Sequence, residues 1–183
     1  MNYNNYVRPF TEAFAKTKGV KLPNEPVLMD EAARRFLWDN VQSEMGEYYL
    51  AKDPWDKTDA LVDAIVYTTD VCLRHGIEPE LPDDIPLNEV FQELTPMYVA
   101  NYLRACIVAE DLDDQRRGVT SLLFALVGSC VLPVEPFLEQ QRLSNGAKIA
   151  KDGTVTLSDK GKILKPEGWK APDVKTLYLS LLQ

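Results

Sequence analysis

The chain has 183 residues, of which 45% are hydrophobic and 26% are charged, a composition that suits one folded domain rather than a disordered chain. Its net charge of −8, with no compensating basic block, argues against a protein that holds nucleic acid by neutralising phosphates. No apolar run approaches the ~20 residues of a membrane span, and "MNYNNYVRPF" lacks the apolar core of a signal peptide. We therefore expect a single domain over residues 1–183 with no nucleic-acid or membrane partner.

Apolar residues recur with a helical period up to about Asn145. The first helix is expected over "FTEAFAKTK", residues 10–18, and Gly19 should end it. Asp30 then occupies a capping position before a long helix with an apolar residue at every fourth position, namely Ala33, Leu37, Val41 and Met45. The pattern predicts a helical core.

The segment "KDPW" carries a strong helix-start signal. Asp53 is placed to cap, Pro54 is favoured at the first helical position, and Asp56 follows three residues after the cap. The segment "HGIEP" is an equally strong stop, so a second long helix is predicted over about 54–75. His75 is the only histidine, and at this helix end it is a cap rather than a catalyst.

The remaining chain divides into helices and a tail. A linker, "PELPDDIP", precedes helical runs over about 87–110 and 113–131, and "VEPFLEQQRLSN" predicts a short helix. These runs are apolar enough to pack on the first pair, so we expect an all-α fold with a four-helix-bundle core. The basic tail, about 146–183, is expected to be irregular apart from a small β-hairpin of "TVTL" against "KILK".

Three cysteines lie far apart inside apolar runs: Cys72, Cys106 and Cys130. Their spacing fits neither a disulfide framework nor a zinc site, which indicates a reducing compartment and a cytoplasmic protein.

The predicted 54–75 helix carries Asp56, Asp59, Asp63 and Asp70 on one face, with Tyr67 in the same row. Asp63 interrupts the apolar octet "ALVDAIVY", where an ionised carboxylate is costly unless it is paired or binds a metal. The alternative is that this face is simply solvated.

The preceding helix carries Glu44 and Glu47, one turn from Asn40. Two helices joined by a short connection should be antiparallel, which brings these acids opposite Asp59 and Asp63. Converging carboxylates suit Mg²⁺, which prefers oxygen ligands and keeps waters and substrate phosphates as the others.

These motifs resemble the all-α nucleoside triphosphate pyrophosphohydrolases, which include MazG and phosphoribosyl-ATP pyrophosphohydrolase (HisE-like). Their signature is Glu-x-x-Glu, a gap, then Glu-x-x-Asp; here "EMGE" supplies the first half and Asp63 the last acid. The third acid would fall at Ala60, and Asp59 of "DALVD" is the substitute that the HisE-like branch uses. Weaker likenesses follow in the same order, in "VRPFTEAF", "PFLEQQRLSNGAK" and "DGTVTLSDKGKILKPEGWKAPDV".

The resemblance implies a Mg²⁺-dependent enzyme, with Mn²⁺ as an alternative metal, that cleaves a nucleoside triphosphate to the monophosphate and pyrophosphate. It implies metal binding by Glu44, Glu47, Asp59 and Asp63, with Glu44, Glu47 and Asp63 catalytic. It also implies a homodimer or larger homo-oligomer. Two alternatives stay open: a catalytically degenerate nucleotide-binding or scaffolding protein of the same fold, permitted by Ala60, and an acidic helical partner protein unrelated to nucleotides.

A triphosphate entering an acidic pocket also needs cationic side chains. The candidates are Lys148, Lys162 and Lys165, whose alternative role is that of solvated surface lysines. Further candidate substrate contacts are Asn40, Tyr67, Asn145, Trp38 and Trp55, where the aromatic rings could stack on a base or simply belong to the core. We expect the tail to cover the triphosphate as a lid, with Lys160 exposed to proteolysis.

Overall fold

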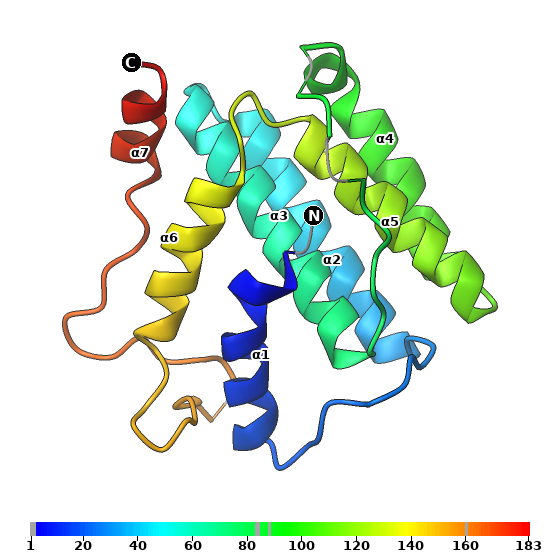
Figure 1. The fold of residues 1–183 in the computed structure, drawn as a ribbon, viewed down its shortest axis with the longest axis vertical. Helices are drawn as coiled ribbons and strands as arrows, with labels where there is room; N and C mark the ends of the chain where they lie inside the picture. Colours follow the sequence, from blue (N-terminus) through cyan, green and yellow to red (C-terminus); the bar gives the residue numbers. More distant parts are fainter. Residues whose placement is uncertain (1–2, 83–84, 88, 160) are drawn as a thin grey trace.

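The structure, a computed structural model, describes residues 3–82, 85–87, 89–159 and 161–183, with the backbone alone for 89–95. The described chain is all-helical and forms no strand. Its helices, shown in Figure 1, are α1 (Asn4–Thr17), α2 (Glu31–Leu50), α3 (Pro54–Arg74), α4 (Glu89–Val108), α5 (Leu112–Gly128), α6 (Glu135–Gly146) and α7 (Val174–Leu181).

Helix α3 is the central element. It packs against α2, α1, α5, α6 and α7, while α4 pairs mainly with α5 at one side of the molecule (Figure 1). The predicted stripe of α2 is confirmed, because Leu37, Val41 and Met45 are buried in the core. On α3, Val62 and Ile65 are fully buried, so the residues on either side of Asp63 are core residues.

Several predicted helix ends are confirmed by local geometry. Asp30 caps α2, since its Oδ1 accepts a hydrogen bond of 2.8 Å from the backbone N–H of Ala33. Helix α3 begins at Pro54, although the Asp53 side chain makes no capping hydrogen bond. After α3, His75 is the cap residue and Gly76 adopts a positive φ of 62°, a conformation that favours glycine.

Two elements differ from the sequence prediction. Helix α1 begins at Asn4 rather than at Phe10, because Tyr3 and Val7 are buried against the core and stabilise turns that precede Pro9. Helix α7 was not predicted within the tail. It forms because Asp173 accepts a hydrogen bond from the Thr176 backbone N–H and because the helix buries Val174 and Tyr178.

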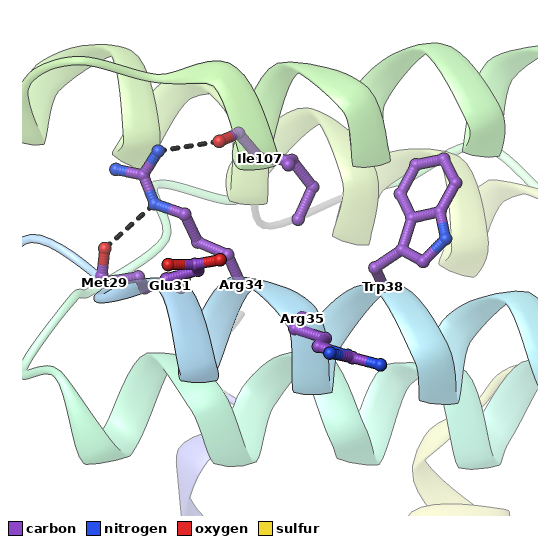
Figure 2. A pocket seen from close by; sticks show the side chains of 6 residues that line it. All are labelled: Met29, Glu31, Arg34, Arg35, Trp38 and Ile107. Atoms are coloured by element: carbon purple, nitrogen blue, oxygen red, sulfur yellow. Dashed lines mark hydrogen bonds between the residues drawn. The ribbon is translucent and has the colours of Figure 1, made fainter.

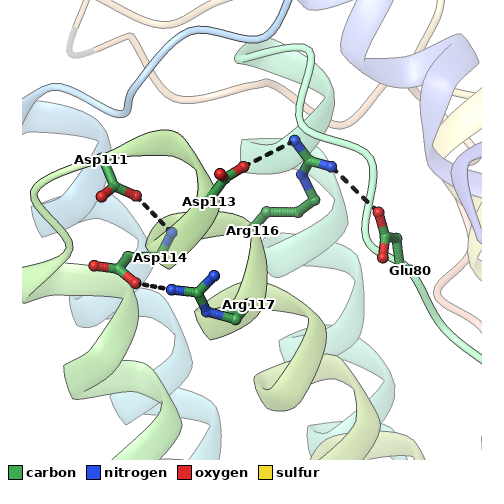
Figure 3. Close-up of polar contacts among 6 residues, drawn as sticks. All are labelled: Glu80, Asp111, Asp113, Asp114, Arg116 and Arg117. Carbon is green, nitrogen blue, oxygen red and sulfur yellow. Dashed lines mark hydrogen bonds and ion pairs between the residues drawn. The ribbon is translucent and has the colours of Figure 1, made fainter.

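Charged contacts hold the start of α5 to the linker that precedes α4 (Figure 3). Asp111 caps α5 by accepting from the Asp114 backbone N–H at 2.8 Å. Arg116 bridges Asp113 of α5 and Glu80 of the linker, and Arg117 pairs with Asp114. The rest of the predicted linker includes Asp83 and Asp84, which lie outside the described residues.

The tail is held to the C-terminal end of α1. The Val155 backbone N–H donates to Oγ1 of Thr17 at 2.8 Å, and Lys16 donates to the backbone carbonyl of Asp152. The predicted hairpin is not confirmed: the contact is an isolated antiparallel bridge between Leu157 and Ile163, and no strand forms in the described part of the tail. Lys160, the predicted site of proteolysis, lies outside the described residues.

The three cysteines are buried and free. No helix in the described part of the chain combines the length and apolar character needed to cross a membrane.

Candidate functional site

A cleft of about 620 Å³ lies among α1, α2, α3, α6 and the tail. Its α3 wall is the face that carries the aspartates, and the tail forms part of the opposite side. The cleft brings together eight residues that the sequence had nominated: Asn40, Asp59, Asp63, Tyr67, Asn145, Lys148, Lys162 and Lys165. Acidic and basic side chains from distant parts of the chain therefore share one cavity.

Asp63 is half-buried in this cleft. Burial, together with the nearby charges of Asp59 and Glu47, raises its pKa to about 7. A hydrogen bond from the side-chain amide of Gln141, on α6, and the positive charge of Lys148 oppose this rise. Asp63, although it lies within an apolar octet of α3, is therefore at the cavity and not deep in the core.

Glu44 lies close to the same aspartates. It is buried, and burial followed by the charges of Asp63, Glu47 and Asp59 raises its pKa to about 8. Burial, then Asp56 and Glu47, also raises the pKa of Asp59. The acids that the resemblance nominates are therefore electrostatically coupled, and each charge makes the others less stable.

The fit of this cluster to a divalent metal depends on its donors and their arrangement. Within the described ranges, no group of three or more His, Cys, Asp or Glu side chains converges closely enough to hold a metal ion. The chemistry of the donors does suit Mg²⁺, because all of them are carboxylate oxygens whose mutual repulsion a cation would relieve. These oxygens would have to move closer together before they could share one ion.

Lys148 is the lysine whose positive charge lowers the pKa of Asp63. Its ammonium donates to Oδ1 of Asn145 at 2.8 Å and lies 4.9 Å from the ring centroid of Trp169 and 5.6 Å from that of Phe10. Burial, and then the charge of Lys165, lowers the pKa of Lys148, while Asp63 opposes that change. Aromatic faces thus hold a partly desolvated cation beside the carboxylates.

Trp169 was missed by the sequence prediction. It lines the cleft, its ring lies 4.1 Å from the Lys165 ammonium, and its indole N–H donates to the backbone carbonyl of Ser144 at 2.9 Å. Its position among the lysines of the tail was a usable signal, because an aromatic ring in a basic loop often accompanies a bound anion or base.

Gln141 was also missed, although its spacing offered a signal. It precedes Asn145 by four residues and Lys148 by seven, so these three residues share one side of α6 and the turn that follows it.

The nominated tryptophans lie elsewhere. Trp38 lines a separate cavity of about 520 Å³ between α2 and α4, next to Arg34 (Figure 2). Arg34 donates two hydrogen bonds there, from Nε to the backbone carbonyl of Met29 at 2.9 Å and from Nη1 to that of Ile107 at 2.6 Å. Trp55 packs under the ammonium of Lys175 on α7, 4.6 Å from its ring centroid. Neither ring reaches the cleft, whose aromatic residues come from α1, α2, α3 and the tail.

Comparison with known proteins found no matching family model, no matching curated protein and no matching solved structure. Any assignment of function therefore depends on the motifs of this sequence and on the side chains of this cleft.

Proposed function

We propose that the protein is a Mg²⁺-dependent nucleoside triphosphate pyrophosphohydrolase with the four-helix core of the all-α superfamily that its motifs resemble. One observation carries the proposal: Asp59 and Asp63 line the same cleft as Lys148, Lys162 and Lys165. Carboxylates, which are the ligand type that Mg²⁺ prefers, and lysines that can neutralise phosphates are the two requirements for binding a metal-triphosphate complex.

In this proposal Glu44, Glu47, Asp59 and Asp63 would hold Mg²⁺ or Mn²⁺. The bound ion would polarise the phosphates and lower the pKa of an attacking water. Lys148, Lys162 and Lys165 would bind and orient the triphosphate, and Asn40, Tyr67 and Asn145 would contact the rest of the substrate. In the metal-free protein the pKa values of Glu44 and Asp63 are raised to about 8 and about 7, and a bound cation would lower both by favouring the ionised carboxylates.

A second candidate is a nucleotide-binding or scaffolding protein of the same fold that has lost catalysis. The specific observation in its favour is that the described carboxylates do not converge into a metal site, and Ala60 stands where the related enzymes carry an acid. Such a protein would bind a nucleotide through the lysines and aromatic rings of the cleft without hydrolysing it.

The experiment that separates the two is a measurement of pyrophosphate release from a panel of canonical and modified triphosphates, with and without Mg²⁺. Calorimetric binding of a non-hydrolysable triphosphate is measured in parallel. Release that requires Mg²⁺ supports the enzyme, binding without release supports the degenerate protein, and the absence of both would contradict each proposal.

We also propose that the protein forms at least a homodimer. Support comes from large apolar side chains that remain exposed on the single chain, such as Leu50 at 84% and Tyr49 at 51% exposure. Light scattering at micromolar concentration should give a mass above the 20.7 kDa of one chain, and a monomer mass would contradict this proposal.

A further inference from the structure

The cleft contains a second cluster of polar side chains, at the C-terminal end of α3, away from Asp59. Asp70 is buried there and accepts a hydrogen bond of 2.6 Å from Oγ1 of Thr11, on α1. Its other oxygen pairs with Nη2 of Arg74, also at 2.6 Å. Both Asp70 and Arg74 line the cleft, so this ion pair is part of its wall.

Aromatic rings hold the guanidinium of Arg74 in place. Its central carbon lies 4.6 Å from the ring centroid of Phe14 and 5.4 Å from that of Phe36, and both rings line the cleft. The Arg74 side chain nevertheless keeps 31% of its surface exposed. An arginine fixed by a carboxylate and by two rings, yet still exposed at a cavity, presents its N–H donors in one orientation at little further entropic cost.

The spacing along α3 sets the distance between the two polar groups. At 1.5 Å per residue, Arg74 lies about 16 Å along the helix axis from Asp63 and about 22 Å from Asp59. A nucleotide whose triphosphate lies between Asp63 and Lys148 could therefore extend along the α3 wall, past Tyr67, toward Arg74, since all of these residues line the cleft. Phe14 and Phe36, whose rings contact the Arg74 guanidinium, add apolar surface to this end of the cleft.

The hydrogen-bond donors and acceptors of Asp70 and Arg74 determine which bases this end of the cleft complements. One oxygen of Asp70 accepts a hydrogen bond from Thr11 and the other is ion-paired with Arg74, while arginine has donors but no acceptor. The group therefore complements a base that presents a carbonyl oxygen, which guanine, cytosine, uracil and thymine do. Adenine does offer acceptors, its ring nitrogens, but it has no ring carbonyl, and on its Watson–Crick and Hoogsteen edges the exocyclic amino group is a donor that would face a second donor of Arg74.

We propose that Arg74, held by Asp70, Phe14 and Phe36, determines base specificity and selects triphosphates whose base carries a ring carbonyl over those that carry adenine. This inference rests on the proposed function, because it assigns the base end of the same nucleotide site. We expect kcat/KM to be at least ~10-fold higher for GTP, CTP or UTP than for ATP, the discrimination that one well-placed hydrogen-bonding group supplies.

The test compares Arg74→Lys with the native enzyme on the four triphosphates. Lysine keeps the positive charge beside Asp70 but loses the planar fork, so the preference over ATP should fall by ~10-fold. Because this substitution disturbs a buried ion pair, a second variant, Arg74→Gln with Asp70→Asn, keeps a neutral hydrogen-bonded pair, and circular dichroism checks that both fold. Arg117→Lys is the matched control, since its ion pair with Asp114 is exposed on α5 and should leave the preference unchanged.

Equal kcat/KM for ATP and the carbonyl-bearing triphosphates, or an unchanged preference in both Arg74 variants, would overturn the inference while leaving the proposed enzyme intact. If no triphosphate is hydrolysed, the proposed activity fails separately. Calorimetry with GMP and AMP in the absence of Mg²⁺ then decides: tighter binding of GMP that Arg74→Lys abolishes supports the assignment, whereas equal or undetectable binding of the two rejects it.

Discussion

Gln141 on α6 donates a hydrogen bond from its side-chain amide to Oδ1 of Asp63 on α3, across 78 residues of sequence. This bond favours the ionised form of a carboxylate that burial and neighbouring acids otherwise disfavour. Asp63 and Gln141 both line the cleft, so this bond is part of its wall. The relationship explains how an aspartate is tolerated between core residues of α3.

Replacing Gln141 should weaken metal binding more than folding. Gln141→Ala removes the donor that orients Asp63, so the Mg²⁺ concentration for half-maximal activity should rise ~10-fold to 100-fold, as for partners of metal ligands in general. The measurement is a Mg²⁺ titration of pyrophosphate release. Gln42→Ala, on the exposed side of α2, is the control and should leave the titration unchanged.

Asp63→Asn should abolish hydrolysis without unfolding the protein. The change removes a nominated metal ligand, and activity should fall at least ~100-fold. The melting temperature without metal should stay constant or rise, because one charge leaves a group of repelling acids. Asp39→Asn, on the surface of α2, should retain full activity. Full activity of the Asp63 variant with normal Mg²⁺ dependence would show that the site is assigned wrongly.

The metal-free protein should become less stable as the pH rises from 5 to 9. The pKa values of Glu44 and Asp63 are raised in the folded state, to about 8 and about 7, so the folded protein binds more protons than the unfolded chain in this window. Stability is therefore fully retained below the unfolded pKa values near 4 and is lost progressively as the pH approaches 8. Thermal melts across this range measure the slope.

Two comparisons test whether the buried acids cause this loss of stability with rising pH. Mg²⁺ should flatten it, because a bound cation stabilises the ionised acids. Glu44→Gln should flatten it without metal, whereas Glu12→Gln, at an exposed position of α1, should not. A melting temperature that rises between pH 5 and 9 in the metal-free protein would contradict the direction of both pKa shifts.

Lys148→Met should raise KM by ~10-fold with a smaller effect on kcat, because the lysine contributes charge to substrate binding beside Asp63. Methionine keeps an unbranched side chain of similar length and removes the ammonium that lies over the rings of Phe10 and Trp169. Lys170→Met, at an exposed tail position, is the control. These substitutions are preferable to a chain that ends at Asn145, since that truncation would also remove α7 and its buried Tyr178.

Gly76→Ala should lower the free energy of unfolding by more than ~1 kcal/mol. Gly76 has a φ of 62°, and a Cβ there would lie 3.0 Å from the backbone oxygen of Glu25. Gly46→Ala is the matched control: this glycine is inside α2 and its Cβ would meet open space, so alanine should stabilise the helix by ~0.5–1 kcal/mol. Urea denaturation monitored by circular dichroism measures both changes.

The sequence was informative where local chemistry decides the structure. The helix boundaries at Asp30, Pro54 and Gly76 follow from capping preferences and backbone conformation, which act within a few residues. The start of α1 and the whole of α7 depend on burial of Tyr3 and Tyr178 by distant segments, and no local pattern specifies such contacts.

The residues of the cleft likewise include some that the sequence indicated and others that only the fold brings together. The helical spacing of Asp59 and Asp63 was visible in the sequence, whereas the approach of Gln141 and Trp169 to them requires the folded arrangement of α6 and the tail. Trp38 was nominated because it lies near one end of a helix expected to bind metal, and that position does not tell which side of α2 its ring occupies.

The tail is fastened at both ends of the part that borders the cleft. Val155 is bonded to Thr17 at the end of α1, and Trp169 and Lys170 are bonded to Ser144 on α6. A segment tethered at both ends by hydrogen bonds forms a strap beside the cleft, and a long polymer could enter beneath it only by threading a free end or by breaking those bonds. Under the proposed function, the strap would therefore admit a free mononucleotide more readily than a base embedded within a nucleic-acid strand.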